Sequence, residues 1–265
     1  MLLLSVDTSS SYGSLSIVQV EKNTYHCLSH KQWISNKEQK YSHSEVITVF
    51  FQEALKEAKV TLNQLQLIIC GVGPGSFTGI RVSANFVKSL SFSLNIPLVA
   101  VSSLESLAQK NKSDLAKKQE LKTEKNPSKK TALPLTPNQP KEALLPLIHA
   151  FSKKIYLAAY TVFDFKSILK KQVVNYNELE TLLSLHNIEL WHVSGDAYPL
   201  FQQYFSNTFK KKLKIYPKIT HPCSLTMVEL FLQSSEKQKN TLNWKNLLPL
   251  YIRSSSAEEL LHSKK

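Results

Sequence analysis

Short apolar runs alternate along the chain with stretches in which apolar residues recur at helical spacing. In the first part of the chain, apolar runs bounded by turn residues predict β-strands at 1–7, 14–20, 24–33, 65–70 and 96–101. The first three form a predicted meander. Apolar residues three and four positions apart predict helices at 44–58 and 79–94. Ser42 and Glu45 have the spacing of a capping box at the start of the first helix.

The second part of the chain repeats this mixture. The same criteria predict strands at 144–149, 154–163 and 189–194, and helices at 176–186, 196–207 and 224–233. Strands and helices mixed in this order indicate an α/β architecture with two similar lobes.

The stretch 109–142 differs from both parts. It contains nine lysines against four acidic residues, four prolines and no aromatic residue. Such a segment buries too little apolar surface to offset the entropy lost on ordering. We therefore expect a flexible or partly helical linker that divides the chain into an N-terminal lobe, 1–108, and a C-terminal lobe, 143–265.

Composition excludes several classes of protein. Hydrophobic residues make up 42% of the 265 residues, which is typical of a globular protein with a core. No apolar run approaches the roughly 20 residues of a membrane span, and the apolar start carries no positive n-region of a secretory signal. The three cysteines fit no zinc spacing and no disulfide framework. We expect a cytoplasmic protein that does not bind a membrane.

The net charge of +13 has two interpretations. One is a polyanionic partner such as RNA, and the other is lysine as the default residue of this protein's surface. Only two of the 33 basic residues are arginine, Arg81 and Arg253. Because arginine is the residue suited to bidentate phosphate and base recognition, its near absence favours the second interpretation.

Four of the six glycines fall within the segment Gly71–Gly79, between a predicted strand and a predicted helix. A loop of this kind can direct free N–H groups at an anion, or it can be a tight structural turn. It lacks the lysine of a P-loop and the spacing of a dinucleotide fingerprint. Arg81 lies in the first turn of the helix, where its charge opposes the dipole. We therefore expect Arg81 either to pair with a buried carboxylate or to contact an anion or another protein.

The segment GVGPGSFTGIRVS, from Gly71 to Ser83, resembles the GRGPGSFTGLR signature of the bacterial TsaB (YeaZ) family of accessory proteins for threonylcarbamoyladenosine formation on tRNA. Supporting matches are LLLSVDTSSSYGSLSIV, HSE, IPLVAVSSLESLAQ, LLPLIHAFSKKIYLAAY, VSGDA and PLYIRSSSAEE. Two positions depart from the family pattern. Val72 replaces an arginine, and His149-Ala150-Phe151 replaces Asp-Ala-Arg.

The resemblance implies two ribonuclease-H-like lobes of the actin-like ATPase (ASKHA) superfamily. The catalytic paralogue of the family carries a His-x-x-x-His metal pair, and the two matching positions here are Ser103 and Leu107. The resemblance therefore implies neither catalysis nor a bound metal. It leaves a weak nucleotide or anion contact open at the first-lobe aspartate and the loop, which are Asp7, Gly73, Pro74, Gly75, Ser76, Phe77, Thr78, Gly79 and Arg81. No other cofactor is expected.

Three histidines are candidates for functional groups. His26 and His30 are four apart in a predicted strand, where they lie roughly 13 Å from each other and cannot share one metal ion. His43 is either a helix-start residue or a general base, and no cysteine or second histidine near it in sequence forms a dyad.

Both N-terminal helices are apolar around more than half their circumference. Each is either deeply buried or has a second apolar face for a partner. The resemblance favours a partner, since family members pair with the catalytic paralogue through these helices and can self-associate in the same way. The candidate interface residues are Val46, Ile47, Phe50, Phe51, Ala54, Phe86, Val87 and Leu90.

The sequence thus leads to a non-catalytic scaffold. Its implied partners are the TsaD-type threonylcarbamoyl transferase and a TsaE-type ATPase, a homodimer is an additional expectation, and tRNA is reached indirectly through the complex. One alternative is a metal-dependent, glycoprotease-like peptidase of the same superfamily. Another is direct tRNA binding through the lysine-rich segment 109–142.

Overall fold

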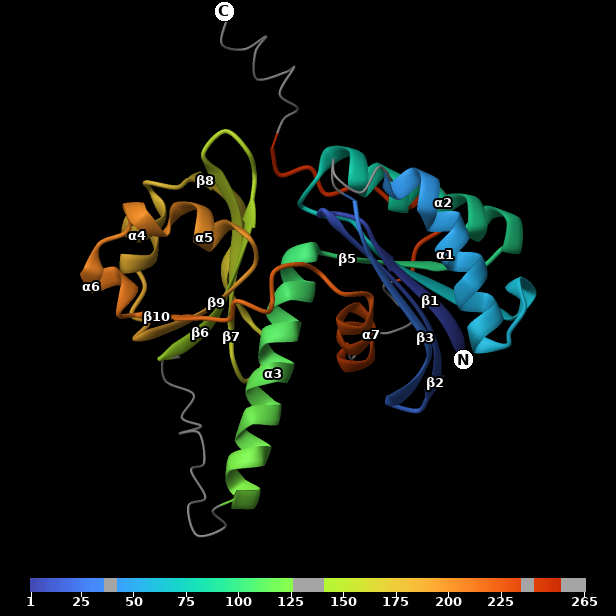
Figure 1. Ribbon diagram of the computed structural model, residues 1–265, viewed down its shortest axis with the longest axis horizontal. Helices are drawn as coiled ribbons and strands as arrows, with labels where there is room; N and C mark the ends of the chain where they lie inside the picture. The colour runs from blue at the N-terminus through green and yellow to red at the C-terminus, as the bar shows by residue number, and fades with distance from the viewer. Residues whose placement is uncertain (36–41, 126–140, 235–240, 254–265) are drawn as a thin grey trace, which may run out of the picture. The chain divides into compact units, whose positions relative to one another are not determined.

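The computed structural model describes residues 1–35, 42–125, 141–234 and 241–253 (Figure 1). The chain divides into unit 1, residues 1–106 and 221–265, and unit 2, residues 107–220. This differs from the predicted boundaries, because the chain after residue 220 groups with the N-terminal lobe. Residues 109–125, predicted as linker, are the larger part of helix α3 (Ser103–Lys125). The rest of that prediction, 126–140, lies outside the described residues.

Unit 1 is built on a five-stranded sheet in the order β3-β2-β1-β4-β5. Its strands are β1 (Leu2–Asp7), β2 (Tyr12–Glu21), β3 (Thr24–Ile34), β4 (Leu67–Gly71) and β5 (Leu98–Val101). The first three are antiparallel, and β4 and β5 run parallel to β1. The predicted meander is confirmed.

Alternating side chains of β1 divide the core of unit 1 into two layers. Leu2, Leu4 and Val6 pack with helices α1 (His43–Ala58) and α2 (Phe77–Leu94) on one face of the sheet. Leu3 packs on the other face with α7 (Ser224–Gln233). The short helices η1 (Leu62–Gln64) and η3 (Trp244–Asn246) complete the unit. Residues near the C-terminus therefore contribute to both layers of the N-terminal lobe.

Unit 2 repeats the topology of unit 1. Its sheet has the order β10-β9-β6-β7-β8, which corresponds strand for strand to that of unit 1. The strands are β6 (Glu142–His149), β7 (Lys154–Thr161), β8 (Ser167–Asn175), β9 (Leu190–Ser194) and β10 (Leu213–Ile215). Again the first three are antiparallel and the last two are parallel to the first. These two units confirm the predicted α/β architecture with two similar lobes.

Helices cover both faces of the second sheet. One face packs against α4 (Leu179–Ser184), α5 (Ala197–Phe201), η2 (Gln202–Tyr204) and α6 (Asn207–Lys210) around a core that includes Trp191. The unit 2 part of α3 lies against the opposite face, where Asn111 Nδ2 donates to the carbonyl of His192 over 3.0 Å. No helix among the described residues has the length and apolar character needed to cross a bilayer.

Candidate functional site

Asp7, at the end of β1, is completely buried. Its Oδ1 accepts hydrogen bonds from the backbone N–H of Ser9 over 2.9 Å and from the Ser9 hydroxyl over 2.8 Å. The Ser103 hydroxyl lies 3.5 Å from Oδ2 and 2.7 Å from the hydroxyl of Ser9. Burial raises the pKa of the Asp7 carboxyl, and the hydrogen bonds from Ser9 partly counter that rise. Asp7 is thus the acceptor in a small buried network with the hydroxyl groups of Ser9 and Ser103.

The glycine-rich loop packs directly on the turn that follows β1. A Cβ atom built on Gly75 would lie 2.1 Å from the carbonyl oxygen of Ser9, and one on Gly79 would lie 2.0 Å from that of Thr8. On Gly71 it would lie 1.8 Å from Asp7 Oδ2. Three of the four glycines are therefore explained by close approach of neighbouring backbone or of a buried carboxylate. This supports the structural-turn interpretation for those three positions.

Hydrogen bonds join the two loops as well. The N–H of Ser76 donates to the carbonyl of Ser9 over 2.6 Å, and the Thr8 hydroxyl donates to the carbonyl of Gly79 over 2.7 Å. Ser76 caps α2 by accepting from the N–H of Gly79. Pro74 follows a cis peptide bond, and Gly73 has a φ of +99°. Two N–H groups at the start of α2 are thus used within the protein, and an anion or nucleotide contact at this loop stays a prediction.

Arg81 lies at the surface, so the prediction of a buried carboxylate partner is wrong. Its Nε donates to the hydroxyl of Tyr251 over 3.0 Å, and its guanidinium lies 3.7 Å from the centre of the Phe77 ring. The Phe77 and Tyr251 rings are 5.2 Å apart. This aromatic–arginine cluster attaches the C-terminal segment to the start of α2. Sequence reasoning missed Tyr251, because it lies 170 positions from Arg81.

The two positions that match the paralogue's metal pair hold no metal ligands of the usual kind. The Ser103 hydroxyl takes part in the Asp7 network, and Leu107 is fully buried. Within the described part of the chain, no three histidine, cysteine, aspartate or glutamate residues cluster in a way that could hold a metal ion. His26 and His30 both lie on β3, which confirms the predicted strand.

His43 begins helix α1 and is buried, as the helix-start interpretation predicts. Its Nδ1 accepts from the indole N–H of Trp33 over 2.9 Å, and its Nε2 lies 2.8 Å from the carbonyl oxygen of Ser10. This pair of contacts is satisfied by the neutral ring with the proton on Nε2. Burial lowers the pKa of His43, which also favours the neutral ring.

The candidate interface residues of α1 and α2 separate into two groups. Ile47, Phe51, Ala54 and Val87 are at most 5% exposed and belong to the core of unit 1, so the buried-helix interpretation is correct for them. The apolar face that α1 and α2 leave partly open consists of Val46, Phe50, Phe86 and Leu90, all half-buried, together with Val49, which is 51% exposed. Val49 was missing from the candidate set, although it follows the same periodicity.

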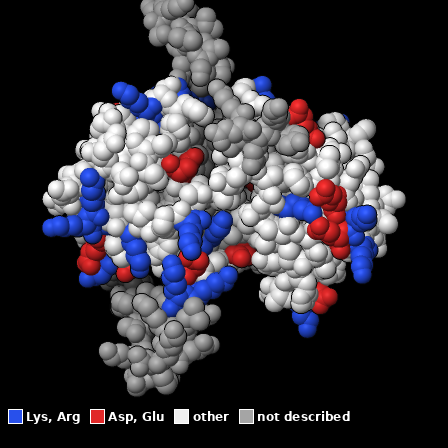
Figure 2. All heavy atoms as spheres, viewed as in Figure 1, with Lys and Arg blue, Asp and Glu red and all other residues white. Residues whose placement is uncertain are grey.

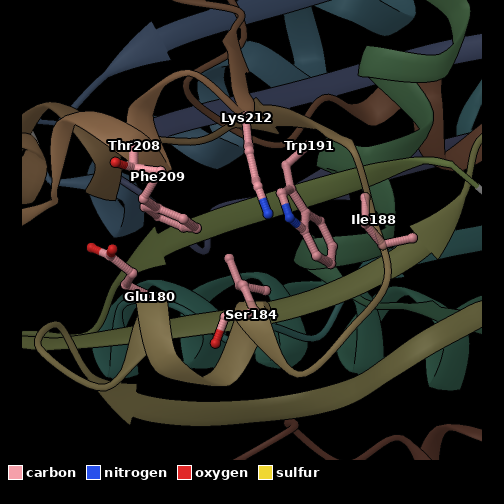
Figure 3. A pocket seen from close by; sticks show the side chains of 8 residues that line it. Glu180, Ser184, Ile188, Trp191, Thr208, Phe209 and Lys212 are labelled. Carbon is pink, nitrogen blue, oxygen red and sulfur yellow. The ribbon is translucent and has the colours of Figure 1, made fainter.

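Unit 2 contains a pocket of about 150 Å³ (Figure 3). Its floor is apolar and buried, with Trp191 and Phe209 among the lining residues. Glu180, Ser184, Thr208 and Lys212 supply polar groups. Figure 3 shows Lys212 extending toward Trp191. The sequence offered no signal for this pocket, because its lining comes from four separate segments between residues 180 and 212.

Comparisons with known proteins give a family-model match, curated relatives and solved structures of the same fold. The family model for TsaD, the tRNA N6-adenosine threonylcarbamoyltransferase, matches residues 33–122. The tRNA threonylcarbamoyladenosine biosynthesis protein TsaB of Buchnera aphidicola subsp. Schizaphis graminum is 36% identical over 118 residues, which cover 44% of this chain and 52% of the relative. TsaB of Haemophilus influenzae is 30% identical over 109 residues, or 41% of this chain and 42% of the relative. The chain thus spans about half the length of the curated relatives it matches.

The solved structure of YeaZ from Pseudomonas aeruginosa aligns with 94% of this chain and 99% of its own length, with a TM-score of 0.67 and 19% identity. This likeness concerns the fold, and it covers both units. The range matched by the family model, residues 33–122, contains the glycine-rich loop.

Proposed function

We propose that this chain, which is similar to TsaB proteins in sequence and to YeaZ in fold, is an accessory, non-catalytic subunit in the synthesis of threonylcarbamoyladenosine on tRNA. The observation that carries the proposal is the partly open apolar face of α1 and α2 in a chain whose would-be metal positions are Ser103 and Leu107. A protein with these features provides a binding surface for a partner, and the partner carries the catalytic groups. This function would place the protein in the cytoplasm.

The partner is a TsaD-type threonylcarbamoyl transferase, and through it a TsaE-type ATPase. Val49 is exposed, and Phe50, Phe86 and Leu90 are half-buried, on two helices that meet through the Phe51 and Phe86 rings. Apolar side chains open to solvent on two adjoining helices suit a helix-on-helix contact. The same surface would serve a homodimer when the transferase is absent. tRNA enters the reaction with the transferase.

The test is reconstitution of tRNA modification with purified transferase and ATPase, with and without this protein. We expect modification to depend on the protein, and a stoichiometric complex with the transferase in a pull-down. Modification at full rate without the protein would overturn the proposal.

Val49→Asp tests the interface, because it places a charge on an exposed position without disturbing the core. We expect it to weaken capture of the transferase at least about ten-fold, since a central interface position typically costs 1–2 kcal/mol or more. Leu62→Asp is the matched control, because Leu62 is also an exposed apolar residue of unit 1 and lies outside both helices. Phe51→Asp is unsuitable, since Phe51 is buried and the change would unfold the lobe. Equal capture by the Val49 and Leu62 variants would contradict the assignment of this face.

The alternative, a glycoprotease-like peptidase, predicts a stoichiometric transition metal and hydrolysis that a chelator abolishes. Metal analysis of the purified protein, together with a peptide-hydrolysis assay, distinguishes it from the scaffold.

A further inference from the structure

The positive charge of the chain is concentrated in one unit. Unit 2 spans 114 residues and contains 19 lysines against nine acidic residues, so it carries +10 of the total net charge of +13. Unit 1 is longer and carries only +3. A general preference for lysine on the surface would charge both units in proportion to their size. The asymmetry therefore calls for an explanation specific to unit 2.

The densest part of this charge is the lysine segment, residues 210–218, which runs from the end of α6 through β10. It contains five lysines and no acidic residue, namely Lys210, Lys211, Lys212, Lys214 and Lys218. Among the residues that the structure describes, no carboxylate lies within ion-pair distance of any of the five. Figure 2 shows basic side chains gathered over the lower part of unit 2 in this view, with fewer acidic ones among them.

Protection of a sheet edge gives one of these lysines a second role. β10 is an edge strand, and an outward lysine on such a strand discourages pairing with another chain. Within β10 that residue is Lys214, and the other four lysines lie outside the strand. Lys212 also has a local role, because it extends toward Trp191 at the pocket (Figure 3). Lys211 and Lys218 are exposed and have no such structural explanation.

We propose that the lysine segment of unit 2 binds the sugar–phosphate backbone of structured RNA, with Lys211, Lys214 and Lys218 as the phosphate contacts. The choice of RNA rests on the proposed function, in which tRNA is the substrate of the complex. Lysine ammonium groups contact phosphates as point charges and read no sequence, so the segment positions the RNA without selecting its bases.

The exposure pattern separates RNA from a lipid surface. Segments that lie on membranes expose apolar residues beside their basic ones. Here Leu213 and Ile215 are half-buried, and Tyr216 is 5% exposed. The segment thus offers charge at its surface without an apolar face for insertion.

The test measures binding of the isolated full-length chain to an unmodified tRNA transcript over a range of salt concentrations. The variant combines Lys211→Gln, Lys214→Gln and Lys218→Gln. Its matched control combines Lys166→Gln, Lys170→Gln and Lys171→Gln, which removes the same charge from β8 and from the residue before it, at the opposite edge of the same sheet. Unfolding midpoints and capture of the transferase are measured for both variants, and phosphatidylserine vesicles replace tRNA in a parallel experiment.

We expect the lysine-segment variant to bind tRNA about ten-fold more weakly at low salt, and the slope of log affinity against log salt to become shallower by about 2, because each lost phosphate contact removes roughly 0.7–0.9 from it. The control should change both quantities much less. Equal losses in the two variants, an unchanged salt slope, or binding to vesicles but not to tRNA would overturn the proposal. RNA binding is measured without the transferase. A failure of the RNA proposal therefore does not affect the capture experiment, which tests the proposed function separately.

Discussion

Gly75 shows how a single residue joins the two loops of the candidate site. A side chain at this position would lie within 2.1 Å of the carbonyl oxygen of Ser9, so the loops would have to separate. We expect Gly75→Ala to lower the free energy of unfolding by about 1–3 kcal/mol, which is the usual cost of overpacking. Urea unfolding followed by circular dichroism measures it. Thr78→Ala, at an exposed position of the same loop, should stay within about 0.5 kcal/mol. Equal effects would contradict this account of the glycine.

His43 makes stability depend on pH. Its pKa is lowered from 6.5 by burial, so the unfolded chain binds the proton more readily than the folded one. The stability from the neutral ring is fully present above pH 6.5 and is lost as the pH falls through the window below it. The pKa of His192 is also lowered by burial and adds to this effect. The buried Asp7, whose pKa is raised, acts in the opposite direction. We therefore expect the urea midpoint to fall more between pH 8 and pH 5 in the unaltered protein than in a variant without His43.

His43→Gln should reduce this pH dependence, because glutamine can still accept from Trp33 and donate to Ser10 but does not titrate. His26→Gln is the control, since His26 is exposed. The same pH dependence in both variants would show that His43 does not cause it.

At the scale of elements, the C-terminal segment 241–253 behaves as a strap on unit 1. It begins with a bridge between Leu98 and Leu242 and ends with the N–H of Leu250 donating to the carbonyl of Val72 over 2.7 Å. Between these points Leu247 is fully buried in the core, whereas its neighbour Leu248 is 70% exposed. Leu247 is therefore the side chain that anchors the strap most deeply in the core of unit 1.

Leu247→Ala should lower the free energy of unfolding by about 2–4 kcal/mol, because it removes a fully buried leucine. Leu248→Ala, one position along, should change it by less than about 0.5 kcal/mol. Thermal unfolding of the two variants measures the difference. A similar loss in both would mean that the strap is not held by this side chain.

The sequence predicts an element well where its apolar pattern is clear. It predicts poorly where charged residues interrupt that pattern or where the contacting residue lies far away in the chain. The strands 1–7 and 24–33 and the helix 224–233 were predicted closely, because each has an apolar pattern of its own. The prediction for 109–142 was a flexible or partly helical linker, and residues 109–125 are indeed helical, because lysine, glutamine and glutamate are good helix formers. Strands β8 and β10 were missed, one because of its paired lysines and the other because it has only three residues.

The candidate site shows the same limits. The glycine-rich loop was located correctly from its composition. The environment of Arg81 was not, because its partner Tyr251 comes from the far end of the chain. The interface prediction included four core residues, since periodicity alone does not tell which side of an apolar helix faces the sheet.

At the scale of the molecule, unit 1 is assembled from two separate stretches of chain. Residues 221–253 supply α7 to one layer of its core and Leu247 to the other. We expect a chain truncated after Thr220 to lose the cooperative unfolding of unit 1 and to expose apolar surface, detected as dye binding. A truncated chain that keeps the thermal transition of the whole protein would contradict this.

This discontinuity also sets the order in which the protein can mature on the ribosome. The residues of unit 2 emerge as one uninterrupted stretch, whereas the first hundred residues must wait until α7 and Leu247 have left the exit tunnel. Nascent chains of intermediate length therefore expose the incomplete apolar core of unit 1. Chaperones would bind the chain mainly during this period.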